Sequence, residues 1–161
     1  MARIIRQEKL ERVMVFCNTK GMVERLTKYL EMEGLDAACI HGDIPQKKRE
    51  QVMARFRRGE LPVFVATDVA ARGIDVDDVD CVINYDVPEE NEYYVHRIGR
   101  TGRAKKKGVA WSIVSNFPEK ARLDDICKYC NFTIQPMVMD KDGSLTPEEV
   151  KAPVTPKRRF R

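Results

Sequence analysis

One histidine and three arginines fall within the eight residues from His96 to Arg103. Arginine stays protonated in proteins, and its planar guanidinium group carries donors that match phosphate oxygens. Two glycines among these charges should end a predicted helix at Ile98, because glycine tolerates the left-handed turn that closes helices. Arg100 and Arg103 would then lie on one side of a tight turn, suited to stabilising a transferring phosphoryl group. A solvated basic loop is an equally good interpretation of this stretch alone.

A second candidate site follows a predicted strand, in the stretch from Ala66 to Asp75. Its small residues would let a ligand approach the backbone closely, and Thr67 adds a hydroxyl group. Arg72 adds a cation beside Gly73, and the carboxylate of Asp75 can accept hydrogen bonds from ribose hydroxyl groups. The competing interpretation is structural, since Thr67 can instead cap a short helix.

A third candidate, Gln46 with Arg49, lies at the start of a predicted helix. Backbone N–H groups at a helix N-terminus favour phosphate, and these two side chains would add donors there. The competing interpretation is a solvated helix face. Taken singly, each of these two short patterns favours its structural interpretation.

The elements that would position these residues alternate along the chain. Short apolar runs predict buried strands, and apolar residues at helical spacing predict the helices between them. The predicted strands are 13–17, 37–40, 63–66, 81–85 and 109–114, and the predicted helices are 20–33, 45–58, 69–72, 88–98 and 118–129. This alternation predicts an α/β fold with a parallel sheet and right-handed crossovers.

Small or polar residues follow several of these strands directly. Asn18 and Thr19 follow the first predicted strand. His41 and Gly42 follow the second, and Thr67 follows the third. Because ligands gather at the carboxyl ends of strands in such sheets, the sequence predicts a binding face at this edge.

The totals narrow the class of protein. A chain of 161 residues suits one domain with a sizeable core. The net charge is only +4, so the position of the basic clusters at 47–58, 97–107 and 157–161 matters more than their number. No apolar run approaches the length of a membrane span, and the first residues carry no signal-peptide pattern. We therefore expect a cytoplasmic protein that makes no membrane contact.

The five cysteines are expected to be free thiols. Cys17, Cys39 and Cys81 fall in apolar strand-like runs, where cysteine behaves as a small hydrophobic residue. Cys127 and Cys130 form a lone Cys-x-x-Cys, and a zinc site would need two further ligands that the two distant histidines do not supply. We expect no metal site.

Taken together and in this order, the segments resemble the motifs of one family. The chain resembles, over about residues 13–130, the second, C-terminal RecA-like domain of the DEAD-box RNA helicases of superfamily 2. Residues 15–19 resemble motif IV, and residues 41–49, with Gln46 and Arg49, resemble the glutamine–arginine motif that follows it. Residues 66–75 resemble motif V, and 96–103 have the motif VI form His-Arg-Ile-Gly-Arg-Thr-Gly-Arg. The resemblance implies a three-layer α/β domain with a mostly parallel central sheet and helices on both faces.

The resemblance also implies roles for individual residues. Arg100 and Arg103 would be arginine fingers on the ATP γ-phosphate, His96 would contact the first domain, and Asp75 would contact the ATP ribose. The RNA sugar–phosphate backbone would lie along Asn18, Thr19, Gly42, Gln46, Arg49, Thr67, Arg72 and Gly73. These groups are not interleaved with aromatic side chains, which favours reading of the backbone rather than of bases. Binding should be independent of sequence and should weaken with salt.

Two parts of such an enzyme are missing from the sequence. It holds neither a Gly-x-x-x-x-Gly-Lys-Ser/Thr phosphate loop nor an Asp-Glu-Ala-Asp segment to hold Mg²⁺. We expect an N-terminal RecA-like domain of the same protein to hold ATP and Mg²⁺, and this chain alone to be inactive. The alternative is a non-catalytic module that binds RNA or protein. A DNA-directed superfamily 2 motor fits the near-verbatim motif VI less well.

The domain limits follow from the same patterns. Residues 1–12 are either a short helix or the remnant of a linker, 13–135 form the helicase domain, and 136–161 form a partly disordered C-terminal extension. Within the extension, Thr146 is expected to cap a helix with Glu149 reaching back to it. The segment from Asp140 to Gly143 lacks the further carboxylate of a calcium loop. The RNA target is not encoded in a recognisable pattern.

Overall fold

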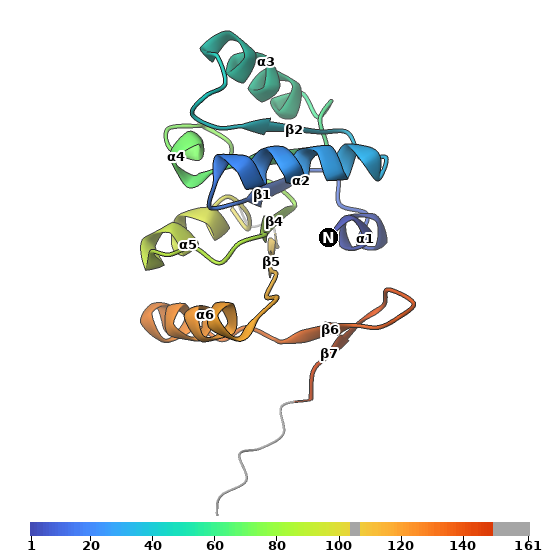
Figure 1. Ribbon diagram of the computed structural model, residues 1–161, viewed down its shortest axis with the longest axis vertical. Helices are drawn as coiled ribbons and strands as arrows, with labels where there is room; N and C mark the ends of the chain where they lie inside the picture. Colours follow the sequence, from blue (N-terminus) through green and yellow to red (C-terminus); the bar gives the residue numbers. More distant parts are fainter. Residues whose placement is uncertain (104–106, 150–161) are drawn as a thin grey trace, which may run out of the picture. The chain divides into compact units, whose positions relative to one another are not determined.

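The computed structural model describes residues 1–103 and 107–149, and it divides into two compact units (Figure 1). The first unit is Met1–Asn131 and the second begins at Phe132. The expected basic cluster at 157–161 and part of the one at 97–107 lie outside the described residues, as does the predicted disorder at the end of the chain.

Five parallel strands form the sheet of the first unit, in the order β2-β3-β1-β4-β5 (Figure 1). The strands are β1 Val13–Phe16, β2 Ala37–Ile40, β3 Val63–Ala66, β4 Cys81–Asn84 and β5 Val109–Ser112. The central strand, β1, pairs Val13 with Val63 on one side and with Cys81 on the other. Every residue of β1, β3 and β4 is buried, which explains their nearly continuous apolar runs. The predicted parallel sheet is confirmed.

Helices cover both faces of this sheet. They are α1 Ala2–Gln7, α2 Lys20–Met32, α3 Gln46–Arg57, α4 Asp68–Ala71, α5 Asn91–Ile98 and α6 Phe117–Cys130. Side chains alternate between the two faces of the sheet along a strand, so each strand contributes to a hydrophobic core on each face. Met14 packs in one core with Phe56 of α3, and Val15 packs in the other with Leu26 of α2. This is the predicted three-layer RecA-like arrangement.

The N-terminal segment belongs to the packing of the first unit. The sequence left a helix or a linker open for residues 1–12, and the structure forms α1 there. Ala2, Ile4 and Ile5 are buried, and Ala2 and Ile5 join the core under α2. No helix within the described ranges is long and apolar enough to cross a membrane.

The end of α5 differs from expectation. Gly99 does follow Ile98 at the end of the helix, but its φ is −66°, so the predicted left-handed closure by this glycine is wrong. The positive φ falls at Gly102, at +73°. The backbone keeps right-handed geometry through Gly99, and the N–H groups of Gly99 and Arg100 still bond to carbonyls of α5. The left-handed residue is therefore needed only where the chain turns away from the helix.

The second unit contains a hairpin where a helix start was expected. β6 (Met137–Met139) pairs antiparallel with β7 (Leu145–Pro147), and Val138 lies opposite Thr146. The prediction that Thr146 caps a helix is therefore wrong. A tight turn forms just before Thr146 in place of a helix N-terminus. Gly143 has φ +90°, and its N–H donates to the Asp140 carbonyl. In the hairpin that follows, backbone N–H and C=O groups of β7 bond to β6 and are not available for the hydrogen bonds of a helix.

Candidate nucleic-acid and nucleotide interface

Several candidate residues lie together at the carboxyl edge of the sheet, as the strand pattern predicted. Asn18, Gly42 and Thr67 lie just beyond β1, β2 and β3, which are neighbours in the sheet. The chain after α4 and the C-terminal half of α5 border the same edge through a shared pocket. Parallel strands with equal register bring their ends into line, so residues far apart in sequence form one surface.

Arg97 is the buried centre of this edge. Its side chain is 1% exposed and forms a bidentate ion pair with Asp68, at 2.7 Å to Oδ1 and 2.6 Å to Oδ2. It also donates to the carbonyl of Asp86 (2.7 Å) and to Oδ1 of Asn18 (2.8 Å), and it lies 5.3 Å from the ring centroid of Phe16. These contacts tie together the segments that follow β1, β3 and β4. The sequence analysis gave Arg97 no role of its own.

Asn18 is exposed, but most of its polar groups already have partners within the domain. Its Oδ1 accepts from Arg97, its Nδ2 donates to the Val87 carbonyl at 3.0 Å, and its backbone N–H donates to Asp86 at 2.8 Å. The side chain predicted to meet RNA is therefore largely engaged in holding Arg97 and the segment after β4. Only one amide hydrogen of Asn18 is left for a ligand in this arrangement.

Two predicted threonines act as helix caps. Thr19 Oγ1 accepts from the N–H of Met22 at the start of α2, at 3.2 Å. Thr67 is 8% exposed, and its Oγ1 accepts from the N–H of Ala70 at 3.4 Å. The structural interpretation of Thr67 is confirmed. Each hydroxyl keeps its own hydrogen, so capping does not prevent donation to a phosphate oxygen.

The loop after β2 is held by a buried histidine. The N–H of Asp43 points at Nδ1 of His41, at 3.2 Å, and Nε2 of His41 lies 2.8 Å from a carboxylate oxygen of Glu24. A backbone N–H can only donate, so Nδ1 is the acceptor and Nε2 carries the proton. Lys20 pairs with Asp43 across the loop at 3.0 Å. Gly42 is thus presented on a fixed turn.

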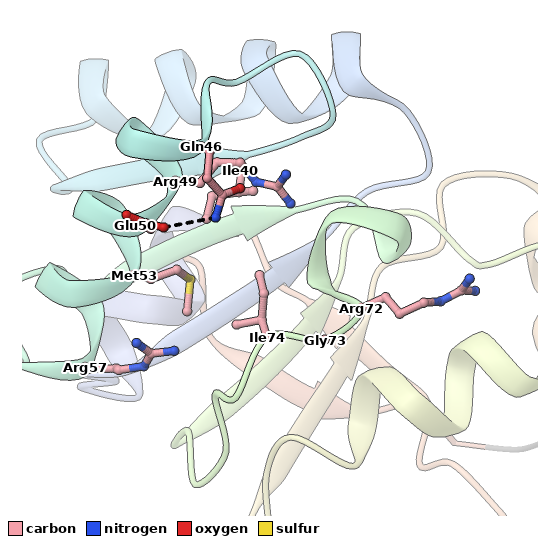
Figure 2. Close-up of a pocket in the computed structure, with 9 residues that line it drawn as sticks. All are labelled: Ile40, Gln46, Arg49, Glu50, Met53, Arg57, Arg72, Gly73 and Ile74. Carbon is pink, nitrogen blue, oxygen red and sulfur yellow. Dashed lines mark hydrogen bonds between the residues drawn. The ribbon is translucent and has the colours of Figure 1, made fainter.

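Four of the predicted RNA-contacting residues line one pocket between α3 and the segment after α4 (Figure 2). They are Gln46, Arg49, Arg72 and Gly73, and the pocket has a volume of about 270 Å³. Gly73 has φ +77°, which a residue with a Cβ would adopt only with strain. This backbone requirement, rather than a lack of space, explains the glycine, because no atom lies within 4 Å of an added Cβ.

A second pocket lies on the other side of the Arg72–Gly73 segment. Its volume is about 260 Å³, and its lining includes His96 and Arg100 together with Asp68 and Arg97. His96 is exposed on α5. Arg72 and Gly73 line both pockets, so this segment lies between Gln46 and Arg49 on one side and His96 and Arg100 on the other. Asp75 and Arg103 are not among the residues that line either pocket.

The two predicted finger arginines are held by backbone carbonyls and by one carboxylate. Arg100 donates to the carbonyl of Ile74 at 2.8 Å and is 20% exposed. Arg103 donates to the carbonyl of Gly99 at 2.6 Å and is 57% exposed. Both face Asp77, with Nη1–Oδ distances of 3.8 Å for Arg100 and 3.0 Å for Arg103. Asp77 was missed by the sequence analysis, because no motif marks it.

The remaining candidate residues differ in their surroundings. Asp75 is exposed on the loop that leads from α4 to β4. Burial raises the pKa of Cys17 and of Cys81 to about 12, so these thiols stay protonated at neutral pH. Burial also raises the pKa of Cys127, with Asp124 adding to the effect. Within residues 1–103 and 107–149 there is no group of three or more potential metal ligands.

The fold and the edge together define a class: a RecA-like α/β domain with basic side chains at the carboxyl ends of parallel strands. Residues 1–105 match the family described as "Helicase conserved C-terminal domain". The chain belongs to this family and is the C-terminal helicase domain of the DEAD-box RNA helicase kind.

Individual relatives agree with this assignment. The chain is 44% identical over 142 residues to the ATP-dependent RNA helicase RhlB of Shewanella frigidimarina, which covers 88% of this chain and 32% of RhlB. It is 49% identical over 132 residues to the ATP-dependent RNA helicase DbpA of Bacillus subtilis, which covers 82% of this chain and 27% of DbpA. The chain thus spans about a third of the length of the curated relatives that it matches.

Solved structures show the same domain. The crystal structure of the E. coli DEAD-box protein SrmB bound to the regulator of ribonuclease activity A has a TM-score of 0.82 and 34% identity, covering 96% of this chain and 88% of that one. The structure of S. cerevisiae Dbp5 bound to RNA and ADP BeF3 has a TM-score of 0.74 and 35% identity, covering 80% of this chain and 34% of that one.

Proposed function

We propose that this chain is the C-terminal half of an ATP-dependent RNA helicase, which grips RNA on one side of the Arg72–Gly73 segment and ATP on the other. The observation that carries the proposal is the pair of pockets sharing this segment, one beside α3 and one beside α5. A short piece of backbone shared by two ligand sites makes it possible for ATP to favour the RNA-gripping state through differential binding.

The RNA side of the proposal uses donors aimed at the sugar–phosphate backbone. Gln46, Arg49, Arg72 and Gly73 line the pocket beside α3, and Thr19, Gly42 and Thr67 continue along the edge of the sheet. Asn18 acts mainly by positioning Arg97. Guanidinium, hydroxyl and backbone N–H groups match phosphate and sugar oxygens, so recognition is independent of base sequence.

The nucleotide side uses three residues of this chain. The exposed carboxylate of Asp75 accepts hydrogen bonds from the ribose, and Arg100 and Arg103 neutralise charge on the γ-phosphate. Arg103 is 57% exposed and Arg100 is 20% exposed, so both guanidinium groups can be reached by a phosphate group that another lobe brings to them. His96, exposed beside them, contacts the N-terminal lobe when the lobes close. Bound ATP supplies the phosphoryl group that is transferred to water.

The rest of the machine lies in an N-terminal RecA-like domain of the same protein. That domain holds ATP and Mg²⁺, and this chain alone has no ATPase activity. Closure of the two lobes brings Arg100 and Arg103 to the phosphate and bends one RNA strand away from its duplex partner. The proposed helicase domain is residues 13–135, with α1 packed against its core, and the protein works in the cytoplasm.

The test is to mix this chain with an N-terminal RecA-like domain and to measure ATPase activity with and without RNA. RNA-stimulated activity should appear only in the mixture, and Arg103→Ala should lower kcat by about 10³-fold or more. Arg25→Ala, an exposed arginine on α2, is the matched control.

Each contrary result bears on a different part of the proposal. An unchanged rate in Arg103→Ala would remove the arginine-finger assignment. Equal stimulation by DNA and RNA would contradict an RNA-directed enzyme. RNA binding without any ATPase activity in the mixture would favour a non-catalytic RNA-binding module instead.

A further inference from the structure

The pocket beside α3 contains an arginine that no motif indicated. Arg57 lines it together with Arg49 and Arg72 (Figure 2). Among the residues that the structure describes, none of these three guanidinium groups has an ion pair or hydrogen bond. The neighbouring arginines of the same helix region do: Arg55 pairs with Asp36 at 3.0 Å, and Arg58 pairs with Glu60 at 2.7 Å. Among the described residues, the arginines of this region that pair with a carboxylate are therefore ones that do not line the pocket, and those that line it form no ion pair.

Helix geometry places Arg57 on the face that carries Arg49. The two residues are eight positions apart, with Met53 midway between them, so they follow one another along one side of α3. Figure 2 shows both side chains on the pocket side of the helix, with Met53 between them. At 1.5 Å per residue their backbones are roughly 12 Å apart along the helix axis. The two guanidinium groups therefore offer an extended row of charge rather than a single cluster.

The charges of the pocket favour a polyanion that runs along the helix. Two guanidinium groups, those of Arg49 and Arg57, lie on the same side as one carboxylate, that of Glu50, which accepts a hydrogen bond from Gln46 at 3.2 Å (Figure 2). The Arg72 side chain points away from them. A lone phosphate would satisfy only one end of a row roughly 12 Å long. A strand of nucleic acid carries phosphates at regular intervals, and guanidinium groups bind such oxygens with well-matched geometry.

We propose that Arg57 binds a phosphate of the RNA strand, further along α3 than the phosphate bound at Arg49. The RNA path then extends beyond the residues that the motifs mark, with Met53 as an apolar spacer between two phosphate contacts. This proposal rests on the proposed function, because it takes the ligand of Arg49 to be RNA. It makes Arg57 a determinant of the length of strand that the domain grips.

The experiment measures binding of fluorescent oligouridines of increasing length to this chain, by anisotropy, over a range of salt. Arg57→Gln should weaken binding of long strands and leave short strands unaffected, because a short strand ends before it reaches Arg57. Loss of one phosphate contact should lower the slope of log K against log salt by about 0.7, so the deficit should shrink about 2.6-fold between about 50 and 200 mM salt. Glu50→Gln should strengthen binding, since it removes the carboxylate of the pocket.

Two further variants make the outcome unambiguous. Arg25→Gln removes an equally exposed arginine from α2 and controls for net charge. Arg49→Gln should weaken binding at every strand length. If Arg57→Gln behaves like Arg25→Gln on long strands while Arg49→Gln still weakens binding, the extended path is wrong and the proposed function stands. If Arg49→Gln also has no effect, the RNA path itself is wrong. Circular dichroism of each variant checks that it is folded.

Discussion

The ion pair between Asp68 and Arg97 offers the sharpest test of how this edge is held together. Asp68→Asn keeps the size of the side chain but removes its charge, leaving a guanidinium group that is 1% exposed without its counter-ion. Breaking a buried pair in this way costs about 3–5 kcal/mol. Because Asn18 and the Asp86 carbonyl still accept from Arg97, we expect about 3 kcal/mol, the lower end of that range.

A loss of this size is a large share of the about 5–15 kcal/mol by which domains are stable. Urea unfolding should report it through Trp111, the only tryptophan, which lies on β5 of the same unit. The matched control is Asp43→Asn. Asp43 pairs with Lys20, and both side chains are exposed, so this ion pair should contribute less than about 1 kcal/mol.

The reasoning fails if the Asp68→Asn variant loses no more stability than the Asp43→Asn variant. A double-mutant cycle with Arg97→Met adds a second check. The buried pair requires a coupling free energy of more than about 1 kcal/mol between positions 68 and 97. Independent, additive losses would mean that Asp68 stabilises the edge by some route other than Arg97.

Three further predictions concern stability. Raising the pH from about 9 toward about 12 should lower the free energy of unfolding by up to about 1.4 kcal/mol per pH unit for each of Cys17 and Cys81. Burial raises the pKa of each thiol from 9.0 to about 12, so the folded state holds protons that the unfolded state releases. Replacing either thiol by alanine should flatten the pH profile, and an unchanged profile would contradict this prediction. Asn116→Ala should lower the free energy of unfolding, measured with urea, by about 1 kcal/mol, because Oδ1 of Asn116 accepts from the Glu119 N–H at the start of α6, at 2.9 Å. No loss would mean that the cap does not stabilise the domain. Asp77→Asn should cost less than about 1 kcal/mol, since its partner Arg103 is 57% exposed; a loss above about 2 kcal/mol would show that this carboxylate holds the turn after α5 together.

The strands could be predicted because their signal is local. β1, β3 and β4 are buried on both faces, so almost every residue in them must be apolar and the run is visible in the sequence. The helix expected at Thr146 does not form, because the structure of this segment depends on pairing with another segment and not on a local signal. A capping pattern offers a weak local preference, and the antiparallel pairing of β6 with β7 satisfies more backbone groups than one turn of helix would.

The chemistry of the site was also partly visible. Residue types and spacing marked Arg49, Arg72 and Arg100 as candidate phosphate ligands in three separate segments, and the structure brings them to two adjoining pockets. The partners of these residues were not visible. Asp77 shares no motif with Arg103, and Arg57 lies outside every motif, so only the folded chain reveals that they face the site.

By itself, then, the sequence determined the parallel α/β fold, the edge where ligands gather and the identity of the cations placed there, because burial and phosphate chemistry restrict residue types locally. Tertiary structure alone decided which of those cations are free to bind. Arg97 is paired with Asp68, 29 positions away, whereas Arg49 and Arg57 form no ion pair with any residue that the structure describes. Ion pairing depends on distances across the fold, and separation along the chain does not encode those distances.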